Sequence, residues 1–178
     1  MKELEQVPER GLSLVVSFSK AYATVPIDTL LVLSKWGDAG VYVTVNKPFE
    51  VLKPVFEKKG IPTERVFFID LITQTSGAKV AEHKNCLFLA SPRNLTDFSI
   101  ALNEVINSLP AGKKFMILDS FNTFTLYNDA QTMLRFTHFI SGRLRAWNVR
   151  GVIFAVKEET DGKLVAQLSQ FVDKIVYF

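Results

Sequence analysis

An apolar stretch that ends in a carboxylate is the first place in this sequence where chemistry could occur. Residues 115–118 are all apolar, and Asp119 and Ser120 follow them directly. In nucleotide hydrolases a carboxylate at the tip of a buried strand holds a magnesium-bound water. An Asp after a strand also serves as a turn or cap residue. The motif alone leaves both roles open, so the rest of a nucleotide site must be sought elsewhere in the chain.

Residues 17–26 follow the first apolar run and are the natural place for a phosphate-binding loop. Such a loop needs glycines, so that backbone N–H groups can approach the phosphate, and then a Lys and a Ser or Thr. This segment has no glycine, and Phe18 and Tyr22 would crowd a phosphate. Lys20 and Thr24 are present but have the wrong spacing. We interpret the segment as an ordinary turn between a strand and a helix, which favours the structural role for the Asp that ends the later strand.

Other combinations of reactive side chains are poorer. His83 and Cys86 are three residues apart, but with only His138 besides, there are too few ligands for a zinc site. The Asp119-Ser120 pair lacks the glycines of a nucleophile elbow. We therefore expect no metal and no cofactor, and we expect Cys86, which begins an apolar run, to be a small buried side chain.

The elements that must position these residues alternate between strand and helix. The expected strands are short and almost continuously apolar, as is typical of parallel strands buried on both faces. They lie at residues 12–18, 41–45, 66–69, 86–89, 115–118, 152–156 and 175–178. This alternation predicts an α/β fold in three layers, with a mostly parallel sheet and helices on both of its faces.

Three helices are the clearest of those between the strands. Residues 94–109 have an N-cap at Asn94, and residues 129–147 carry an apolar face at helical spacing. A third helix at residues 48–59 contains Pro54, which predicts a kink or a late start. The polar stretches at residues 73–85 and 158–162 are expected to form a long loop and a charged turn.

Length and composition suit one folded domain over residues 1–178, with residues 1–10 as a lead-in. Apolar residues make up 48% and charged residues 22% of the chain, which excludes a disordered protein. The net charge of +3 is weak support for a nucleic-acid partner. With one cysteine, a charged amino terminus and no apolar run near the roughly 20 residues of a membrane span, we expect a soluble cytoplasmic protein.

The succession of segments resembles a known family. The resemblance rests on the strand at residues 40–45, on residues 65–70 and 91–97, and on the strand that ends at residues 118–120. Together these look like a KaiC-like member of the RecA superfamily, and residues 168–174 are similar to archaeal KaiC-like domains that have lost the phosphate-binding loop. The resemblance covers nearly the whole chain from about Gly11. It implies a RecA-like fold of the P-loop NTPase type.

The same resemblance draws attention to two departures. In KaiC-type ATPases a pair of glutamates follows the second strand and activates the attacking water, and the matching positions here are Asn46 and Lys47. An amide cannot act as a general base, and an ammonium has the wrong charge for that task. Of the loop, the glutamates and the strand-tip carboxylate, only the last is retained. Any remnant of a nucleotide site would consist of Lys20, Thr24, Asp119 and Ser120.

Basic residues gather on the helix at residues 129–147. Arg135, His138 and Arg145 are spaced i, i+3 and i+10, which predicts that they share one face, and Arg143 lies nearby. One interpretation is a solvated helix surface whose last turns favour cations. The other is a docking stripe for an acidic partner or for nucleic-acid phosphates.

Three functions remain open on these grounds. The leading hypothesis is a non-catalytic KaiC/RecA-like domain with a regulatory or signalling role, which binds a protein partner, such as a true KaiC/RecA-type ATPase, or a second copy of itself. The second is a nucleotide-binding ATPase with a non-standard phosphate site that uses Asp119 and Lys20. The third is a nucleic-acid-binding accessory protein that uses the basic residues 135–150.

Overall fold

The strands of the protein form one sheet. A computed structural model describes residues 5–36, 38–78 and 80–178. Within them the strands are β1 (Gly11–Ser17), β2 (Ala39–Thr44), β3 (Val66–Asp70), β4 (Cys86–Phe88), β5 (Lys114–Asp119), β6 (Val149–Val156) and β7 (Lys174–Tyr177). Each overlaps an expected strand, but β6 begins three residues earlier than the sequence predicts. Arg150 and Gly151 interrupt its apolar run, yet Gly151 belongs in the sheet because a Cβ there would lie 2.5 Å from the Leu144 side chain.

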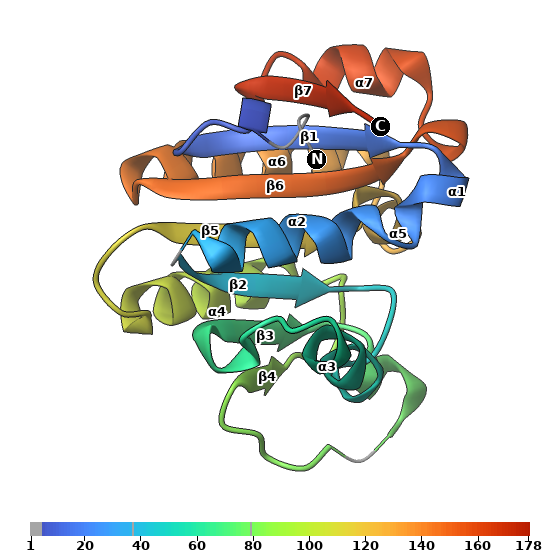
Figure 1. The fold of residues 1–178 in the computed structure, drawn as a ribbon. Coiled ribbons are helices and arrows are strands. Elements are labelled where there is room, and N and C mark those ends of the chain that lie inside the picture. Colours follow the sequence, from blue (N-terminus) through green and yellow to red (C-terminus); the bar gives the residue numbers. More distant parts are fainter. Residues whose placement is uncertain (1–4, 37, 79) are drawn as a thin grey trace.

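Every hydrogen-bonded pair of strands is parallel. The strands lie side by side in the order β4-β3-β2-β5-β6-β1-β7, and Figure 1 shows them running in one direction. The carboxyl ends of the strands therefore gather at one edge of the sheet and the amino ends at the opposite edge. The predicted α/β fold with a mostly parallel sheet is confirmed.

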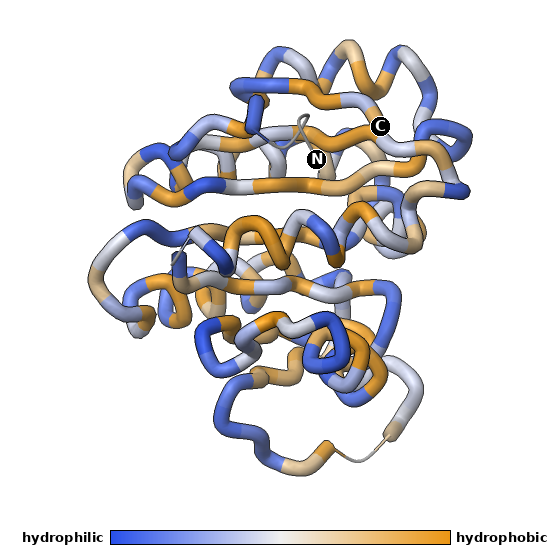
Figure 2. The backbone as a smooth tube through the Cα atoms, viewed as in Figure 1, coloured by the Kyte–Doolittle hydropathy of each residue, from blue (hydrophilic) through white to orange (hydrophobic). Residues whose placement is uncertain are grey.

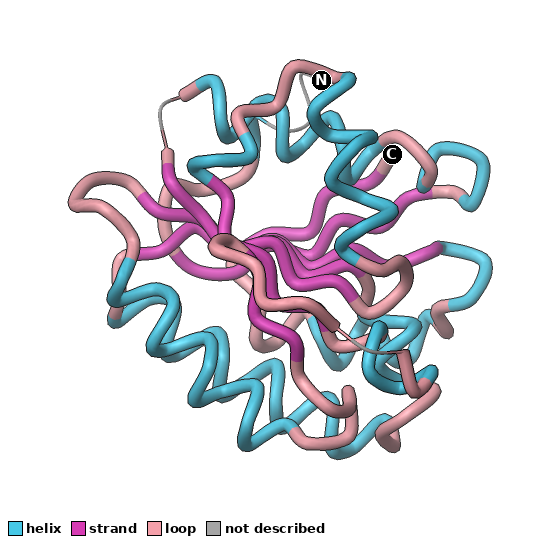
Figure 3. Tube along the Cα trace, turned by 90° about the horizontal axis from the view of Figure 1, so that it is seen from below, coloured by secondary structure: helices cyan, strands magenta, loops and turns pink. Residues whose placement is uncertain are grey.

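Helices cover both faces of this sheet, as Figure 3 shows. They are α1 (Ser19–Tyr22), α2 (Val25–Lys35), α3 (Phe49–Lys58), α4 (Leu95–Ser108), α5 (Phe121–Thr125), α6 (Ala130–Ala146) and α7 (Gly162–Leu168). Buried side chains of α2 and α3 form one core with the sheet, and those of α4, α5, α6 and α7 form the other. Within the described residues no helix combines the length and the apolar character that crossing a membrane requires.

Much of the core is aromatic. Phe49, Phe56, Phe68 and Tyr42 are fully buried on the α3 side, and their rings contact one another at centroid distances of 4.9–6.0 Å. Figure 2 shows that hydrophobic residues concentrate along the strands, whereas the loops at the sheet edges are largely hydrophilic. Most of the phenylalanine-rich composition is therefore explained by the two cores.

Local signals for the helices are largely borne out. The Asn94 side chain accepts a hydrogen bond from the backbone N–H of Asp97, so it caps α4 as predicted. Residues 73–78 and 80–85 belong to the expected loop, with a short 3-10 turn at Thr73–Ser76, and residue 79 of the predicted range lies outside the described residues. Of the kink or late start predicted for α3, the late start does not occur, because the helix begins at Phe49 and continues through Pro54. Proline is tolerated there because buried Phe49 and Phe56 anchor the helix on either side of it.

Candidate functional site

The carboxyl edge of the sheet brings together residues from three separate segments. Asp119 ends β5, Asn46 lies two residues beyond β2, and Tyr22 ends α1, which follows β1. The chain continues from β2 toward β3 but from β5 toward β6, so the direction in which strands are added reverses between β2 and β5. Ligands of open α/β sheets bind at such a switch point. This edge is therefore the candidate functional site.

The Asp119 carboxylate is buried, and both of its oxygens accept hydrogen bonds. Oδ2 accepts from the Tyr42 hydroxyl at 2.6 Å. Oδ1 accepts from the Tyr22 hydroxyl and from the Asn46 side-chain amide, the latter at 3.1 Å. A carboxylate that is 7% exposed needs such partners, because an unpaired buried charge is costly. Three side chains from α1, β2 and the β2–α3 turn therefore hold this carboxylate.

Asn46 connects the carboxylate to the start of α5. Its Nδ2 also lies 3.1 Å from the Tyr22 hydroxyl oxygen and 3.4 Å from Ser120 Oγ. Its Oδ1 accepts a hydrogen bond from the Thr123 hydroxyl. Ser120 in turn caps α5 by accepting from the backbone N–H of Thr123. We call this group the Asp119 cluster; it consists of Tyr22, Tyr42, Asn46, Asp119, Ser120 and Thr123.

Burial sets the protonation of the Asp119 cluster. It raises the pKa of Asp119, and the hydrogen bonds from Tyr22, Tyr42 and Asn46 oppose that rise in part. Burial and the adjacent carboxylate both raise the pKa values of Tyr22 and Tyr42. The two phenols therefore remain protonated and act as hydrogen-bond donors, which is the role that the geometry gives them.

Two pockets open beside the Asp119 cluster. One has a volume of about 340 Å³ and reaches Pro26 and Leu52, and the other, of about 320 Å³, reaches Val156. Both are lined by Ser19, Tyr22 and Asn46, so these side chains stand between the two pockets. The arrangement can accept small polar groups, but its central carboxylate is already bonded to protein.

The structure separates two of the predicted remnant residues from the other two. Asp119 and Ser120 both belong to the Asp119 cluster. Lys20 and Thr24 are exposed, and neither lines the two pockets beside it. The Thr24 hydroxyl instead donates to the carbonyl of Ala21 within the turn between α1 and α2. The predicted crowding by Tyr22 takes the form of a direct hydrogen bond to the carboxylate.

The basic residues of α6 do not form one uniform stripe. Arg145 makes an ion pair with Asp173 at 2.9 Å and donates to the carbonyl of Phe171. Arg143 stacks over the Trp147 ring, 4.6 Å from its centroid, and donates to Asn103 of α4. Arg135 and His138 are exposed. Arg143 and Arg145 therefore bond to side chains outside α6, and reversing the charge of Arg145 would remove an ion pair of the fold.

His83 and Cys86 lie near one another at the edge of the β4 strand. Cys86 is buried, as predicted, and the His83 ring packs against Phe49 at a centroid distance of 4.6 Å. Across the ranges that the structure describes, no three His, Cys, Asp or Glu side chains gather in a way that could hold a metal ion.

Sequence reasoning missed two members of the Asp119 cluster. Tyr42 lies inside an apolar strand, and a buried phenol hydroxyl usually finds a hydrogen-bond partner. That requirement was the signal by which Tyr42 could have been identified. Thr123 had no comparable signal.

A second buried carboxylate, Asp70, accepts hydrogen bonds from the backbone N–H groups of Phe49, Ile72 and Thr73 and so fixes the turn after β3.

The fold of this protein matches that of a solved structure. The structure is similar to the crystal structure of a KaiC-like protein from the hyperthermophilic archaeon Pyrococcus horikoshii, with a TM-score of 0.63 and 14% sequence identity over 96% of this chain and 71% of that one. At this identity the likeness shows the fold alone. The protein therefore has a RecA/KaiC-like fold, and the resemblance found in the sequence is confirmed at that level.

A family match places the chain more closely. Residues 14–178 match DUF7504, a family of unknown function, and the chain belongs to that family. No curated protein matches the sequence.

Proposed function

We propose that this protein is a RecA/KaiC-like domain that does not hydrolyse nucleotides and that acts as a regulatory module by binding other proteins. The observation that carries the proposal is the bonding of Asp119, the one ATPase part whose residue type is retained. Tyr22, Tyr42 and Asn46 donate to its two oxygens. A magnesium-bound water would have to displace these donors before it could bind the carboxylate.

The turn after β1 supports the proposal independently. A phosphate cradle needs backbone N–H groups that are free to point at the anion. Here the N–H groups of Ala21 and Tyr22 bond to the carbonyl of Phe18, at 2.9 and 3.0 Å. The N–H and the hydroxyl of Ser19 bond to the Glu158 carboxylate. The donors that could hold a phosphate are thus in use, and a negative charge lies beside them.

The residues at the positions of the KaiC-type glutamates do not supply a general base. Asn46, which matches the first glutamate of KaiC-type ATPases, is committed to the Asp119 cluster through both ends of its amide. Lys47, at the second position, is exposed. Because neither can accept a proton from water at neutral pH, the proposed absence of hydrolysis follows from chemistry as well as from geometry.

A surface over α4 and α6 supports binding to proteins. Ile100 of α4 and Phe139 of α6 are 54% and 49% exposed. Ile100 lies about one helical turn before Asn103, and Phe139 about one turn before Arg143. The Arg143 side chain donates a hydrogen bond to Asn103 and so joins the two helices. Arg135, also exposed on α6, adds positive charge nearby. Exposed apolar side chains beside a cation suit a partner with an acidic, partly apolar surface.

The absence of nucleotide chemistry can be tested directly. We expect magnesium and ATP to leave the melting temperature unchanged and to give no turnover above background. A bound nucleotide at 100 times its dissociation constant would stabilise the protein by about 2.7 kcal/mol, which is readily detected. A melting shift or a turnover that disappears in Asp119→Asn would instead support an ATPase with a non-standard phosphate site.

Binding to proteins requires its own test with matched variants. The double variant Arg135→Glu/Phe139→Ser changes one cation and one exposed aromatic residue on α6. The control, Lys58→Glu/Val55→Ser, makes the same kinds of change on α3, across the sheet. We expect co-purifying proteins, or self-association measured by sedimentation, to be lost with the first variant and kept with the control. A chain that stays monomeric and retains no specific partner would contradict this part of the proposal.

A further inference from the structure

The amino edge of the sheet, opposite the Asp119 cluster, holds a buried cation. Arg150, the second residue of β6, has a side chain that is only 5% exposed. Its Nε donates to the carbonyl of Pro8 at 3.0 Å, and its guanidinium stacks over Trp36, 4.7 Å from the ring centroid. Burial lowers the pKa of this arginine, while Asp38 and Glu9 oppose that shift. The fold therefore holds a cation in place at a cost in solvation.

The pairing of Arg150 is incomplete. A guanidinium has five N–H donors, and among the described residues one of them makes a hydrogen bond. The nearest carboxylate oxygens, on Asp38 and Glu9, lie 3.6 and 3.9 Å from Nη1 and Nη2. These distances allow Coulomb attraction but exceed those of hydrogen bonds. Nη1 is buried and has no hydrogen-bond partner in the described part of the chain.

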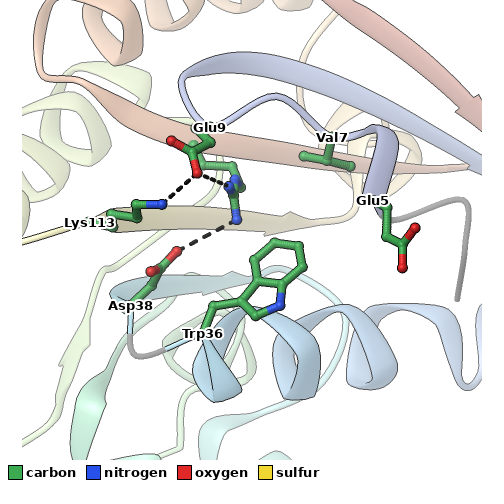
Figure 4. A pocket seen from close by; sticks show the side chains of 7 residues that line it. Glu5, Val7, Glu9, Trp36, Asp38 and Lys113 are labelled. Atoms are coloured by element: carbon green, nitrogen blue, oxygen red, sulfur yellow. Dashed lines mark hydrogen bonds and ion pairs between the residues drawn. The ribbon is translucent and has the colours of Figure 1, made fainter.

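A pocket of about 460 Å³ opens against this arginine. Figure 4 shows Trp36 and Val7 on two sides of it, with Glu9, Lys113 and Asp38 grouped at one end. Trp36 is 46% exposed, so a broad aromatic wall faces the pocket. The site thus combines an apolar slot with two cations, Arg150 and Lys113, and with three carboxylates, on Glu5, Glu9 and Asp38.

Glu9 shows which ligand group this end of the pocket accepts. Its Oε1 accepts a hydrogen bond from the Lys113 ammonium and lies beside Arg150, and Lys113 lowers the pKa of this carboxyl. The Glu9 side chain is nevertheless 69% exposed, unlike Asp38, which is 2% exposed. A carboxylate from outside could therefore take the place of Glu9 without disturbing the core, and it would then lie beside Lys113 and Nη2 of Arg150.

We propose that this pocket binds a small carboxylate with a flat apolar body, and that Glu9 of the lead-in competes for the same position. The carboxylate would meet Lys113 and Arg150, while the apolar body would lie between Trp36 and Val7. At the end of the pocket where Glu9, Lys113 and Asp38 are grouped, displacing Glu9 leaves two cations beside Asp38, while Glu5 lies apart from them on the side of Val7 (Figure 4). An anion is therefore favoured over a neutral ligand at that end. The inference does not depend on the proposed function, since it concerns the opposite edge of the sheet.

The test uses benzoate as the probe and benzamide as its neutral isostere. Trp36 fluorescence reports binding in a Trp147→Phe background, because these are the two tryptophans of the chain. We expect saturable binding of benzoate at concentrations up to about 10 mM, and binding of benzamide at least about tenfold weaker, a difference of about 1.4 kcal/mol.

Variants separate the proposed site from adventitious binding. Glu9→Gln should strengthen benzoate binding about tenfold by removing the competing carboxylate, and Lys113→Met should weaken it by a similar factor. Lys163→Met, which removes an exposed lysine on α7, is the matched control and should change nothing. Equal affinity for benzamide, an unchanged affinity in Glu9→Gln, or no saturable binding in that variant would each overturn the proposal.

Discussion

At the carboxyl edge of the sheet the Asp119 carboxylate accepts hydrogen bonds from three side chains, whereas at the amino edge the Arg150 guanidinium makes one hydrogen bond among the described residues. Both charges are buried. A buried charge whose partners are complete stabilises the arrangement around it, while one with spare donors can still gain from a ligand. At the carboxyl edge, where the switch point lies, the buried charge therefore has its hydrogen-bond partners within the protein. At the amino edge the buried charge keeps donors that a ligand could use.

The largest expected effect comes from removing the Asp119 carboxylate. Asp119→Ala leaves the Tyr22, Tyr42 and Asn46 donors buried without an acceptor, so we expect a loss of about 3 kcal/mol or more in the free energy of unfolding. Denaturant unfolding measures it, with exposed Glu104→Ala as a control that should stay within about 0.5 kcal/mol. A loss below about 1 kcal/mol would show that the cluster is not structural.

A smaller loss is expected from removing one donor. Tyr22→Phe keeps the ring but deletes the hydroxyl that donates to Asp119 and accepts from Asn46. Hydrogen bonds to charged groups contribute about 1.5–3 kcal/mol, and we expect the lower part of that range because Tyr42 and Asn46 remain. The same unfolding measurement applies, and the variant should still show no ATP turnover. Turnover that appears when the hydroxyl is removed would mean that Tyr22 alone blocks an intact ATPase.

The pH dependence of stability sharpens the comparison at one residue. Because burial raises the pKa of Asp119 above its unfolded value, the native state holds more protons than the unfolded state just above that value. The stability contributed by this group is then complete at low pH and falls as pH rises through the native pKa. Asp119→Asn should cost below about 1–2 kcal/mol at neutral pH, and the wild-type advantage over it should shrink as pH rises above about 4. An advantage that grows with pH would contradict this sign.

The smallest effect is expected at the open edge. Removing both charges in Asp38→Asn/Arg150→Met also removes their desolvation cost, so the double variant should lose less than about 1 kcal/mol. Arg150→Met alone should lose more, because it leaves the Asp38 carboxylate buried without its cation. Unfolding of the two single variants and the double variant measures this coupling. A double variant as damaged as Asp119→Ala would mean that the buried charges of the two edges do not differ in how much they contribute to stability.

Much of the fold could be predicted from the sequence because its signals are local. Continuous apolar runs indicated buried parallel strands, and Asn94 three residues before Asp97 indicated a helix start. The start of α3 ahead of Pro54 reflects a tertiary effect, since buried Phe49 and Phe56 lie on either side of the proline. The late prediction of β6 has a similar origin, because Arg150 looks like a loop residue until its partners are known.

The candidate site could be predicted only in part. Asp119 stood out as a carboxylate at a strand tip, and Tyr22 as an obstacle to a phosphate. That Tyr42 reaches the same carboxylate depends on the pairing of β2 with β5, which places Thr44 opposite Asp119. Lys20 and Thr24 looked like remnants because of their residue types, yet the turn directs them to solvent.

By itself the sequence determined the alternation of strands and helices and the lack of glycine in the turn after the first strand, because each of these follows from residue types within a few positions. That Asn46 and Lys47 stand in the place of a glutamate pair is what the family resemblance implies. Only the tertiary structure decided which buried charges have hydrogen-bond partners. Asp119 meets Tyr22 from 97 residues away, and Arg150 meets Pro8 from 142 residues away. Such neighbours are set by the order of strands in the sheet, which brings distant side chains to a common edge and is not written in any local pattern.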